Sequence, residues 1–157
     1  MLHFHYSTLI DAPVEVVWKF HERSDILQIL TPPWQPVQII RRQGGLEIEA
    51  ISEFIIWLGP IPVKWVAVHT EYEKYRLFTD EQKEGPMASW THRHQFSEEN
   101  GQTRLTDAIA FSLPGDKLAE SFLGWWVDSR LNDMFKYRHD VTKRECERGV
   151  GSEGVGE

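Results

Sequence analysis

Hydrophobic and polar residues alternate along much of the chain between residues 37 and 113, which is typical of strands that bury one face. Two stretches follow another period. In residues 13–21 and 116–147 the apolar positions recur every three or four residues, and that spacing predicts helices. Strands and helices therefore occupy separate parts of the sequence, an order typical of an α+β protein.

The expected strands are bounded by Gly, Pro and Asn residues that favour turns. They cover residues 2–10, 37–42, 47–58, 62–72, 76–84, 89–99 and 102–113. Asn100-Gly101 joins the last two strands, and this dipeptide is a strong hairpin signal because both residues tolerate a positive φ. Each strand can pair with its neighbour through a short connection, so we expect one curved antiparallel sheet of about six or seven strands.

Two short helices should follow the first strand. Pro13 has the fixed φ of a first helical turn, Ser24 can cap the second helix, and Pro32-Pro33 ends it. Asp116 can cap a long helix that ends at about Glu147 and fills the concave side of the sheet. The apolar stripe of this helix and its flank comprise Phe122, Leu123, Trp126, Val127, Leu131, Met134 and Val141.

The 157 residues correspond to one domain, and no linker or internal repeat divides them. We assign residues 1–147 to this domain. Residues 148–157 are rich in glycine and lack a hydrophobic pattern, so we expect them to form a disordered C-terminal tail.

The net charge of −7 argues against nucleic acid as a partner, because binding to a phosphate backbone depends on clustered Lys and Arg. The single cysteine, Cys146, excludes an internal disulfide. The first residues lack the pattern of a secretory signal, and no window approaches the roughly 20 apolar residues of a membrane span. We therefore expect a cytoplasmic protein with no membrane span, and the sequence indicates no oligomeric state.

The hairpin at Asn100-Gly101 fixes which residues face one another across the last two strands. With a two-residue turn, His94 lies opposite Asp107, and the same face carries Trp90, His92, Ile109 and Phe111. Because the other face is mostly polar or small, we expect this one to be concave and to face the long helix. Matching registers would add Phe54, Trp65, His69, Phe78, Asp80 and Gln82 from the preceding strands.

Buried polar groups without partners cost about 1–3 kcal/mol each, so these groups must bond to one another, to water or to a ligand. One interpretation is a structural network in which His94 bonds to Asp107, and His92 or His69 bonds to Asp80. A second is that this network is the polar end of a ligand pocket. A metal site at His92 and His94 with a third carboxylate ligand, and a His–Asp general base, are further alternatives.

Several motifs resemble those of one superfamily. The transition from strand to helix at residues 10–18 (IDAPVEVVW) is similar to that of the START-like, helix-grip superfamily, also called Bet v 1-like or SRPBCC. Residues 31–34 (TPPW), 78–82 (FTDEQ), 85–87 (GPM) and 90–96 (WTHRHQF) resemble its bacterial cyclase/dehydrase-like ligand-binding subgroup. The resemblance covers about residues 2–147. It implies an α+β helix-grip fold, in which a curved antiparallel sheet surrounds a long C-terminal helix.

The resemblance leaves the activity open, because this superfamily includes lipid carriers, hormone receptors, aromatase/cyclases, oxygenase domains and co-chaperones. It implies no cofactor, and we expect no tightly bound metal. It also places Pro33 and Trp34 at a pocket entrance. The predicted pocket itself comprises Phe54, Trp65, His69, Phe78, Asp80, Gln82, Trp90, His92, His94, Asp107, Ile109, Phe111, Phe122, Leu123, Trp126 and Val127.

The abundance of aromatic residues, with seven Trp and eight Phe, favours a non-catalytic protein that binds or transports a small hydrophobic or aromatic molecule. One alternative is a cyclase or dehydratase that acts on such a molecule through a His–Asp pair. Another is a module that binds a protein partner, as co-chaperone members do. We favour the binder because the sequence has no GxSxG, HExxH or P-loop motif, and Cys146 stands beside Glu145 and Glu147, which disfavour a thiolate.

Overall fold

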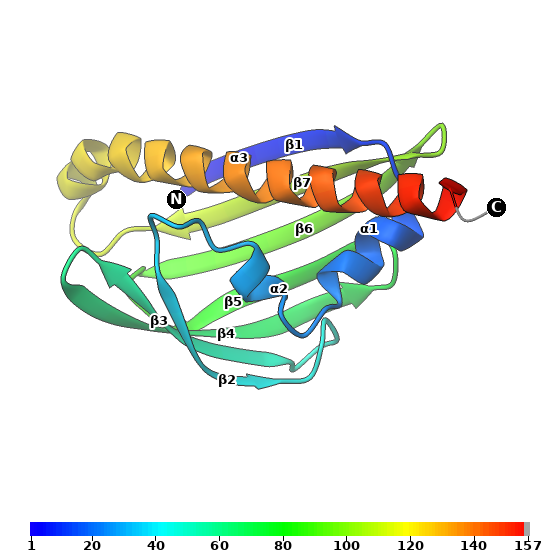
Figure 1. Cartoon of the computed structure of the whole chain (residues 1–157). Helices are drawn as coiled ribbons and strands as arrows, with labels where there is room; N and C mark the ends of the chain where they lie inside the picture. The colour runs from blue at the N-terminus through cyan, green and yellow to red at the C-terminus, as the bar shows by residue number, and fades with distance from the viewer. Residues whose placement is uncertain (156–157) are drawn as a thin grey trace.

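Within residues 1–155, the part of the chain that the structure describes, seven strands form one antiparallel sheet around a long helix (Figure 1). The structure is a computed structural model whose side chains are described up to residue 148. The strands are β1 (Leu2–Ile10), β2 (Val37–Gln43), β3 (Ile51–Leu58), β4 (Ile61–Glu73), β5 (Leu77–Glu84), β6 (Ser89–Glu99) and β7 (Gln102–Ser112). The helices are α1 (Val14–His21), α2 (Ile26–Ile29) and α3 (Lys117–Val155). The predicted α+β helix-grip fold is confirmed.

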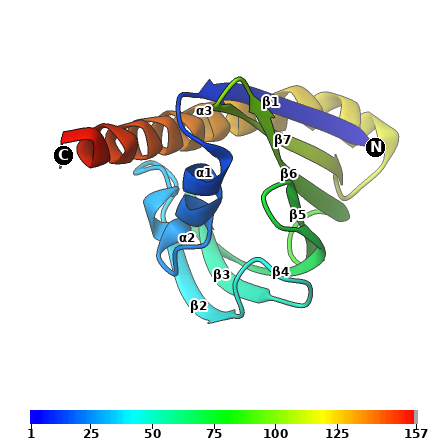
Figure 2. The same cartoon turned by 90° about the vertical axis from the view of Figure 1, so that its right-hand side faces the viewer.

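From β2 to β7 each strand pairs with the next one along the chain, and the last strand, β7, also pairs with the first strand, β1. The resulting order is β1-β7-β6-β5-β4-β3-β2. Figure 2 shows the sheet bent into a deep curve, with α1 and α2 on its open side and α3 across one end of the curve. Helix α3 packs chiefly against β1 and α1, so it lies over the β1 half of the sheet.

The turn at Asn100-Gly101 sets the register of the inner face as predicted. Both of its residues have a positive φ, 53° and 82°. Across this hairpin His94 pairs with Asp107, and between β5 and β6 Asp80 pairs with His92. The register between β3 and β4 also matches the prediction. The predicted alignment of the inner face is therefore confirmed on these strands.

Strand β3 begins later than predicted. It starts at Ile51 rather than at residue 47, and Ile48, within the predicted range, is 55% exposed. Gly44 and Glu49 both have a positive φ, near 79° and 72°. These conformations are incompatible with an extended strand, so the segment before Ala50 forms a turn in spite of its alternating pattern.

Asp116 caps α3 as expected, since its carboxylate accepts a hydrogen bond from the backbone amide of Ala119 at 2.9 Å. The predicted apolar stripe is only partly correct. Leu131 is 7% exposed, but Leu123 is 44% exposed. Near its start the helix passes over β1 at Gly124, where an added Cβ would lie 3.4 Å from a methyl carbon of Leu2. Gly124 therefore occupies the sheet-facing position, which turns Leu123 outward.

Helix α3 continues to Val155, beyond the predicted end near Glu147. Glycine weakens a helix, which is why the sequence favoured a stop, but it leaves the backbone hydrogen bonds of the helix possible. Residues 156 and 157 of the predicted tail lie outside the described residues. The division of the chain into a domain and a tail stays a prediction.

The core consists of two apolar clusters. One surrounds Trp18 of α1, which is fully buried and meets the rings of Phe78 and Phe96 edge to face at 5.8 and 5.0 Å. The other surrounds Phe111 of β7 and Phe135 of α3. We call them the Trp18 cluster and the Phe135 cluster.

The Trp18 cluster contains a buried histidine. His21 is 5% exposed, and its Nδ1 donates a hydrogen bond to the carbonyl oxygen of Val17 at 2.8 Å. Its ring packs against Phe20 and Phe96. Removal from water lowers the pKa of His21 to about 4, so this side chain is neutral at pH 7.

The Leu131→Ala substitution should lower the free energy of unfolding by about 2–5 kcal/mol, because it leaves a cavity beneath α3. Urea denaturation measures this loss. Leu123→Ala on the same helix is the matched control and should change the stability by less than about 0.5 kcal/mol. Equal losses in the two variants would contradict the assignment of the buried face.

Stability should fall as the pH is lowered from 6.5 towards 4, because the unfolded chain binds a proton at His21 that the folded chain does not. The contribution is on the order of 3 kcal/mol. Urea denaturation across this range should show a shallower acid loss in His21→Met than in the wild type. The exposed His5 provides the control His5→Met, which should keep the wild-type profile. If the His21→Met profile also matched the wild type, the assigned pKa would be wrong.

Candidate functional site

Five polar side chains meet between the concave face of the sheet and α3. We call them the polar belt: Asp80 of β5, His92 and His94 of β6, Asp107 of β7 and His139 of α3. The polar belt separates the two apolar clusters. On β7, for example, Leu105 belongs to the Trp18 cluster and Ile109 to the Phe135 cluster, with Asp107 between them.

Asp107 is the centre of the polar belt and is 4% exposed. Its Oδ1 accepts a hydrogen bond from Nε2 of His92 at 2.6 Å and lies 3.0 Å from Nδ1 of His94. Its Oδ2 accepts a hydrogen bond from Nε2 of His139 at 2.5 Å. Burial alone would raise the pKa of this carboxyl group. The hydrogen bonds from the three histidines outweigh burial and hold the pKa of Asp107 well below its usual range.

His94 lies between two carboxylates. While its Nδ1 faces Asp107, its Nε2 donates a hydrogen bond to Oδ2 of Asp80 at 2.9 Å. Carboxylates only accept, so both ring nitrogens carry hydrogen and the ring is an imidazolium. Burial opposes this charge, but the contacts with Asp107 and Asp80 raise the pKa of His94 to about 9. The same contact with His94 helps to hold the pKa of Asp80 below its usual range, although burial alone would raise it.

His92 is in a different protonation state. Its Nε2 donates to Asp107, whereas its Nδ1 lies 3.8 Å from Oδ2 of Asp80, too far for a hydrogen bond. Burial and the nearby charge of His94 lower the pKa of His92. His92 is therefore neutral, with its hydrogen on Nε2 and a lone pair on Nδ1.

The predicted contact of His94 with Asp107 is confirmed, but two other predicted inner-face residues bond elsewhere. Nδ1 of His69 lies 2.8 Å from the carbonyl oxygen of Leu46 rather than bonding to Asp80. The side-chain amide of Gln82 bonds to both the amide and the carbonyl of Met87, so it holds the turn between β5 and β6. These backbone partners could not be foreseen, because they depend on the conformation of loops.

Sequence reasoning missed two residues of α3. His139 follows the buried Phe135 by four residues, and that helical spacing was the available signal. Arg138 places its guanidinium over the ring of Phe135 at 5.3 Å. Among the side chains that the structure describes, its buried Nε has no hydrogen-bond partner. Burial lowers the pKa of Arg138, which marks a costly position for a charge.

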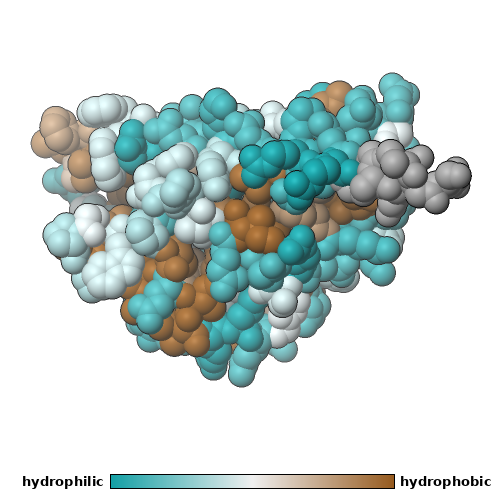
Figure 3. Space-filling view, viewed as in Figure 1, coloured by the Kyte–Doolittle hydropathy of each residue, from teal (hydrophilic) through white to brown (hydrophobic). Residues whose placement is uncertain are grey.

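Aromatic rings extend along the concave face beside the polar belt. We call them the aromatic row: Phe54, Trp65, Trp90 and Phe111, with successive ring centroids 6.2, 5.2 and 5.7 Å apart. Trp65 and Phe111 are buried, whereas Phe54 and Trp90 are only half-buried. Part of this apolar surface is therefore exposed. Hydrophobic side chains also reach the molecular surface below α3 in Figure 3.

Three residues of α3 do not lie where the pocket prediction needed them. Phe122, Leu123 and Trp126 are 74%, 44% and 50% exposed, because the helix presents Gly124 to the sheet at this point. Val127 does face inward and packs, half-buried, against the Phe135 cluster. Phe78 and Ile109 are buried within the two apolar clusters.

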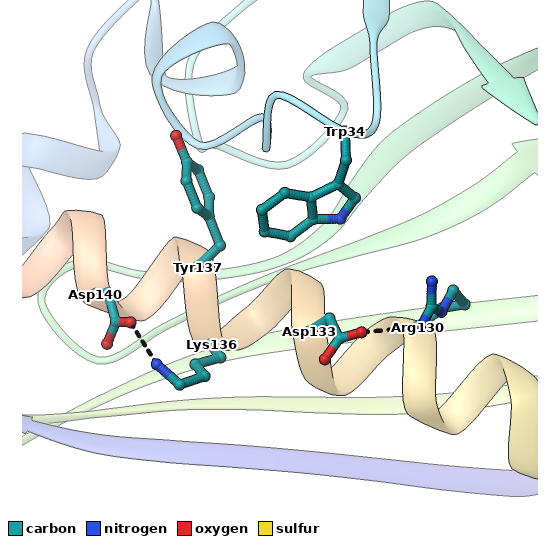
Figure 4. Close-up of a pocket in the computed structure, with 6 residues that line it drawn as sticks. All are labelled: Trp34, Arg130, Asp133, Lys136, Tyr137 and Asp140. Atoms are coloured by element: carbon teal, nitrogen blue, oxygen red, sulfur yellow. Dashed lines mark hydrogen bonds and ion pairs between the residues drawn. The ribbon is translucent and has the colours of Figure 1, made fainter.

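The loop after α2 borders two hollows. Trp34 and Tyr137 form a groove of about 420 Å³ against α3, with their rings 5.4 Å apart (Figure 4). The remaining residues that line this groove are Arg130, Asp133, Lys136 and Asp140. Pro33 borders a second hollow of about 280 Å³ between α2 and β2. Neither hollow includes a residue of the polar belt, so both lie outside it.

A curved antiparallel sheet around a long C-terminal helix defines the helix-grip class of folds. The family model described as polyketide cyclase / dehydrase and lipid transport matches residues 10–139. The chain belongs to this family. The START-like resemblance of the sequence is thereby confirmed.

Solved structures agree with this assignment. The ZhuI aromatase/cyclase from Streptomyces sp. R1128 is 13% identical, with a TM-score of 0.74 and coverage of 95% of each chain. Protein TTHA0849 from Thermus thermophilus is 15% identical, with a TM-score of 0.70 and coverage of 94% of this chain and 99% of that one. At these identities the likeness shows the fold alone.

A third structure, the nucleoside-diphosphate sugar epimerase from Corynebacterium glutamicum, is 30% identical over 94% of this chain, with a TM-score of 0.66. The chain spans 29% of that longer protein. No curated protein matches the chain. Among the described residues, no helix is both long and apolar enough to cross a membrane.

The Asp107→Asn substitution should lower the free energy of unfolding by about 3–5 kcal/mol, because it leaves the buried His94 charge with one carboxylate and weakens three contacts. Urea denaturation measures the loss. Asp133→Asn removes an exposed carboxylate that pairs with Arg130 and should cost less than about 1 kcal/mol. A similar small loss in Asp107→Asn would show that the polar belt contributes little to the fold.

Proposed function

We propose that the protein binds a small hydrophobic or aromatic molecule against the aromatic row, with the polar belt at the polar end of the site. Pro33 and Trp34 are assigned to the entrance, next to the groove against α3. The family description, which includes cyclase, dehydrase and lipid transport, supports such a ligand class.

The observation that carries this proposal is the half-buried state of Phe54 and Trp90. Both side chains point towards the inside of the curved sheet, yet each keeps part of its surface exposed. Contact with an apolar ligand would remove this surface from water and stabilise the complex by about 25 cal/mol for each Å². Binding of this kind is typical of concave sites that combine aromatic walls with a few polar groups.

Arg138 supports a polar or acidic group on the ligand. Its buried Nε has no partner among the described side chains, and a buried donor without a partner costs about 1–3 kcal/mol. A ligand oxygen that accepts this hydrogen bond would remove that cost. The ligand would then place its apolar body on the aromatic row and its oxygen near α3.

A second candidate function is catalysis on the bound molecule. His92 favours it, because its Nδ1 carries a lone pair while Asp107 fixes the ring through Nε2. A neutral imidazole oriented by a carboxylate is the arrangement of a general base. Native mass spectrometry of a molecule that co-purifies from the host would separate the two functions: a binder returns it unchanged, whereas an enzyme changes its mass on incubation.

Titration with anilinonaphthalene sulfonate, a hydrophobic dye with an acidic group, tests the binding function. We expect saturable fluorescence enhancement. Trp90→Leu should weaken binding about tenfold, because it removes an aromatic contact worth about 1–1.5 kcal/mol. Trp125→Leu is the matched control, because Trp125 is 68% exposed on α3 and lies outside the aromatic row.

Non-saturable dye binding would overturn the proposal. So would a larger loss in Trp125→Leu than in Trp90→Leu, because the dye would then occupy the outer surface of α3. Urea denaturation of both variants verifies that each remains folded at the temperature of the titration.

A further inference from the structure

Three potential metal ligands converge within the polar belt. Asp80, His92 and His94 each offer a ligand atom that lies within 4.8 Å of the ligand atoms of the other two. The two histidines are separated by one residue on β6, and Asp80 pairs with His92 from the neighbouring strand. The site is therefore built on paired strands of the sheet rather than on loops.

The separations of these atoms suit a common ion. A transition metal bonds to histidine nitrogen and carboxylate oxygen at about 2.0–2.2 Å, so ligand atoms in a tetrahedral site lie about 3.3–3.5 Å apart. The oxygen of Asp80 lies 2.9 Å from the nitrogen of His94 and 3.8 Å from that of His92. Small rotations of the side chains would bring both distances to the required value.

The second nitrogen of each histidine faces Asp107. Nε2 of His92 and Nδ1 of His94 lie 2.6 and 3.0 Å from the same oxygen of that carboxylate. The other oxygen is held by His139 of α3. Histidines that ligate metals usually donate their other N–H to a carboxylate or carbonyl, which fixes the ring and makes the ligating nitrogen more basic. Asp107 orients the rings of both His92 and His94 in this way.

The charges also fit a divalent cation. Asp80 and Asp107 supply two negative charges, and in the metal-free protein the imidazolium of His94 balances one of them. A divalent ion that replaced the proton on Nε2 of His94 would balance both carboxylates, with both imidazoles in their neutral, ligating form. One carboxylate with two histidines is a donor set that zinc and ferrous iron both use, and three protein ligands leave a coordination position for water or a ligand.

We propose that Asp80, His92 and His94 bind one divalent transition-metal ion of the zinc or ferrous class, with Asp107 and His139 positioning the two histidines. The sequence alone favoured no tightly bound metal, because the family resemblance brings none and the residue pattern did not define a complete set of ligands. This inference goes beyond the proposed ligand binding and does not depend on it.

The test uses the full chain without an affinity tag, treated with a chelator and then titrated with cobalt(II), zinc(II) or, under anaerobic conditions, iron(II). We expect one equivalent to bind, cobalt(II) to give visible absorption bands, and zinc(II) to raise the melting temperature. His92→Ala and His94→Ala should abolish these signals. Asp107→Asn should weaken binding about 10–100-fold.

His3→Ala and His5→Ala are the matched controls, because these two histidines also alternate along a strand but lie exposed on β1. Both controls should bind the ion as the wild type does. The absence of a saturable equivalent, or binding that survives in His92→Ala and His94→Ala, overturns the proposal. Dye binding by the metal-free protein is measured in parallel, so that failure of metal binding can be separated from failure of ligand binding.

Discussion

The carboxylate of Asp107 is the group on which the arrangement of the helix and the sheet depends. It accepts hydrogen bonds from His92 on β6 and His139 on α3 and lies within 3.0 Å of His94. A buried carboxylate that lost these donors would pay a desolvation cost of several kcal/mol, so the helix must keep His139 in place. Apolar packing alone would tolerate small shifts of α3. The hydrogen bond from His139 to Asp107 restricts the position of α3 relative to the sheet.

The polar belt interrupts a core that would otherwise be continuous. On β6 the inward positions run from Trp90 through His92 and His94 to Phe96, so polar residues stand between two apolar ends. The same order recurs on α3, where His139 follows Phe135 and precedes the buried Val141. Replacement of such a network by apolar residues is often neutral or stabilising in proteins. Stability alone therefore gives no reason for a polar network at this position.

The sequence predicted the sheet more accurately than the helix, for physical reasons. Asn100-Gly101 adopts one turn, and a strand has only two faces, so one turn fixed the inward set on β6 and β7. The side chains of a helix point in many directions around its axis, so a turn at one end does not fix which residues face the sheet. On α3 the sheet-facing position is Gly124, which contributes no hydrophobic signal, and the pattern selected Leu123 and Trp126 instead. His139 was missed because a polar residue on a buried stripe is recognised only when its partner is known.

Helix α3 is anchored unequally along its length, and this explains why part of the concave face is open. From Leu131 onwards it buries Phe135, His139 and Cys146, whereas nearer its start Phe122 and Trp125 are more than two-thirds exposed, at 74% and 68%. Contacts of α3 with the sheet are made chiefly with β1, at one edge. Strands β3 and β4 lie towards the other edge of the sheet. The aromatic row therefore runs from β7, beside the strand that α3 contacts most, to a half-buried Phe54 on β3.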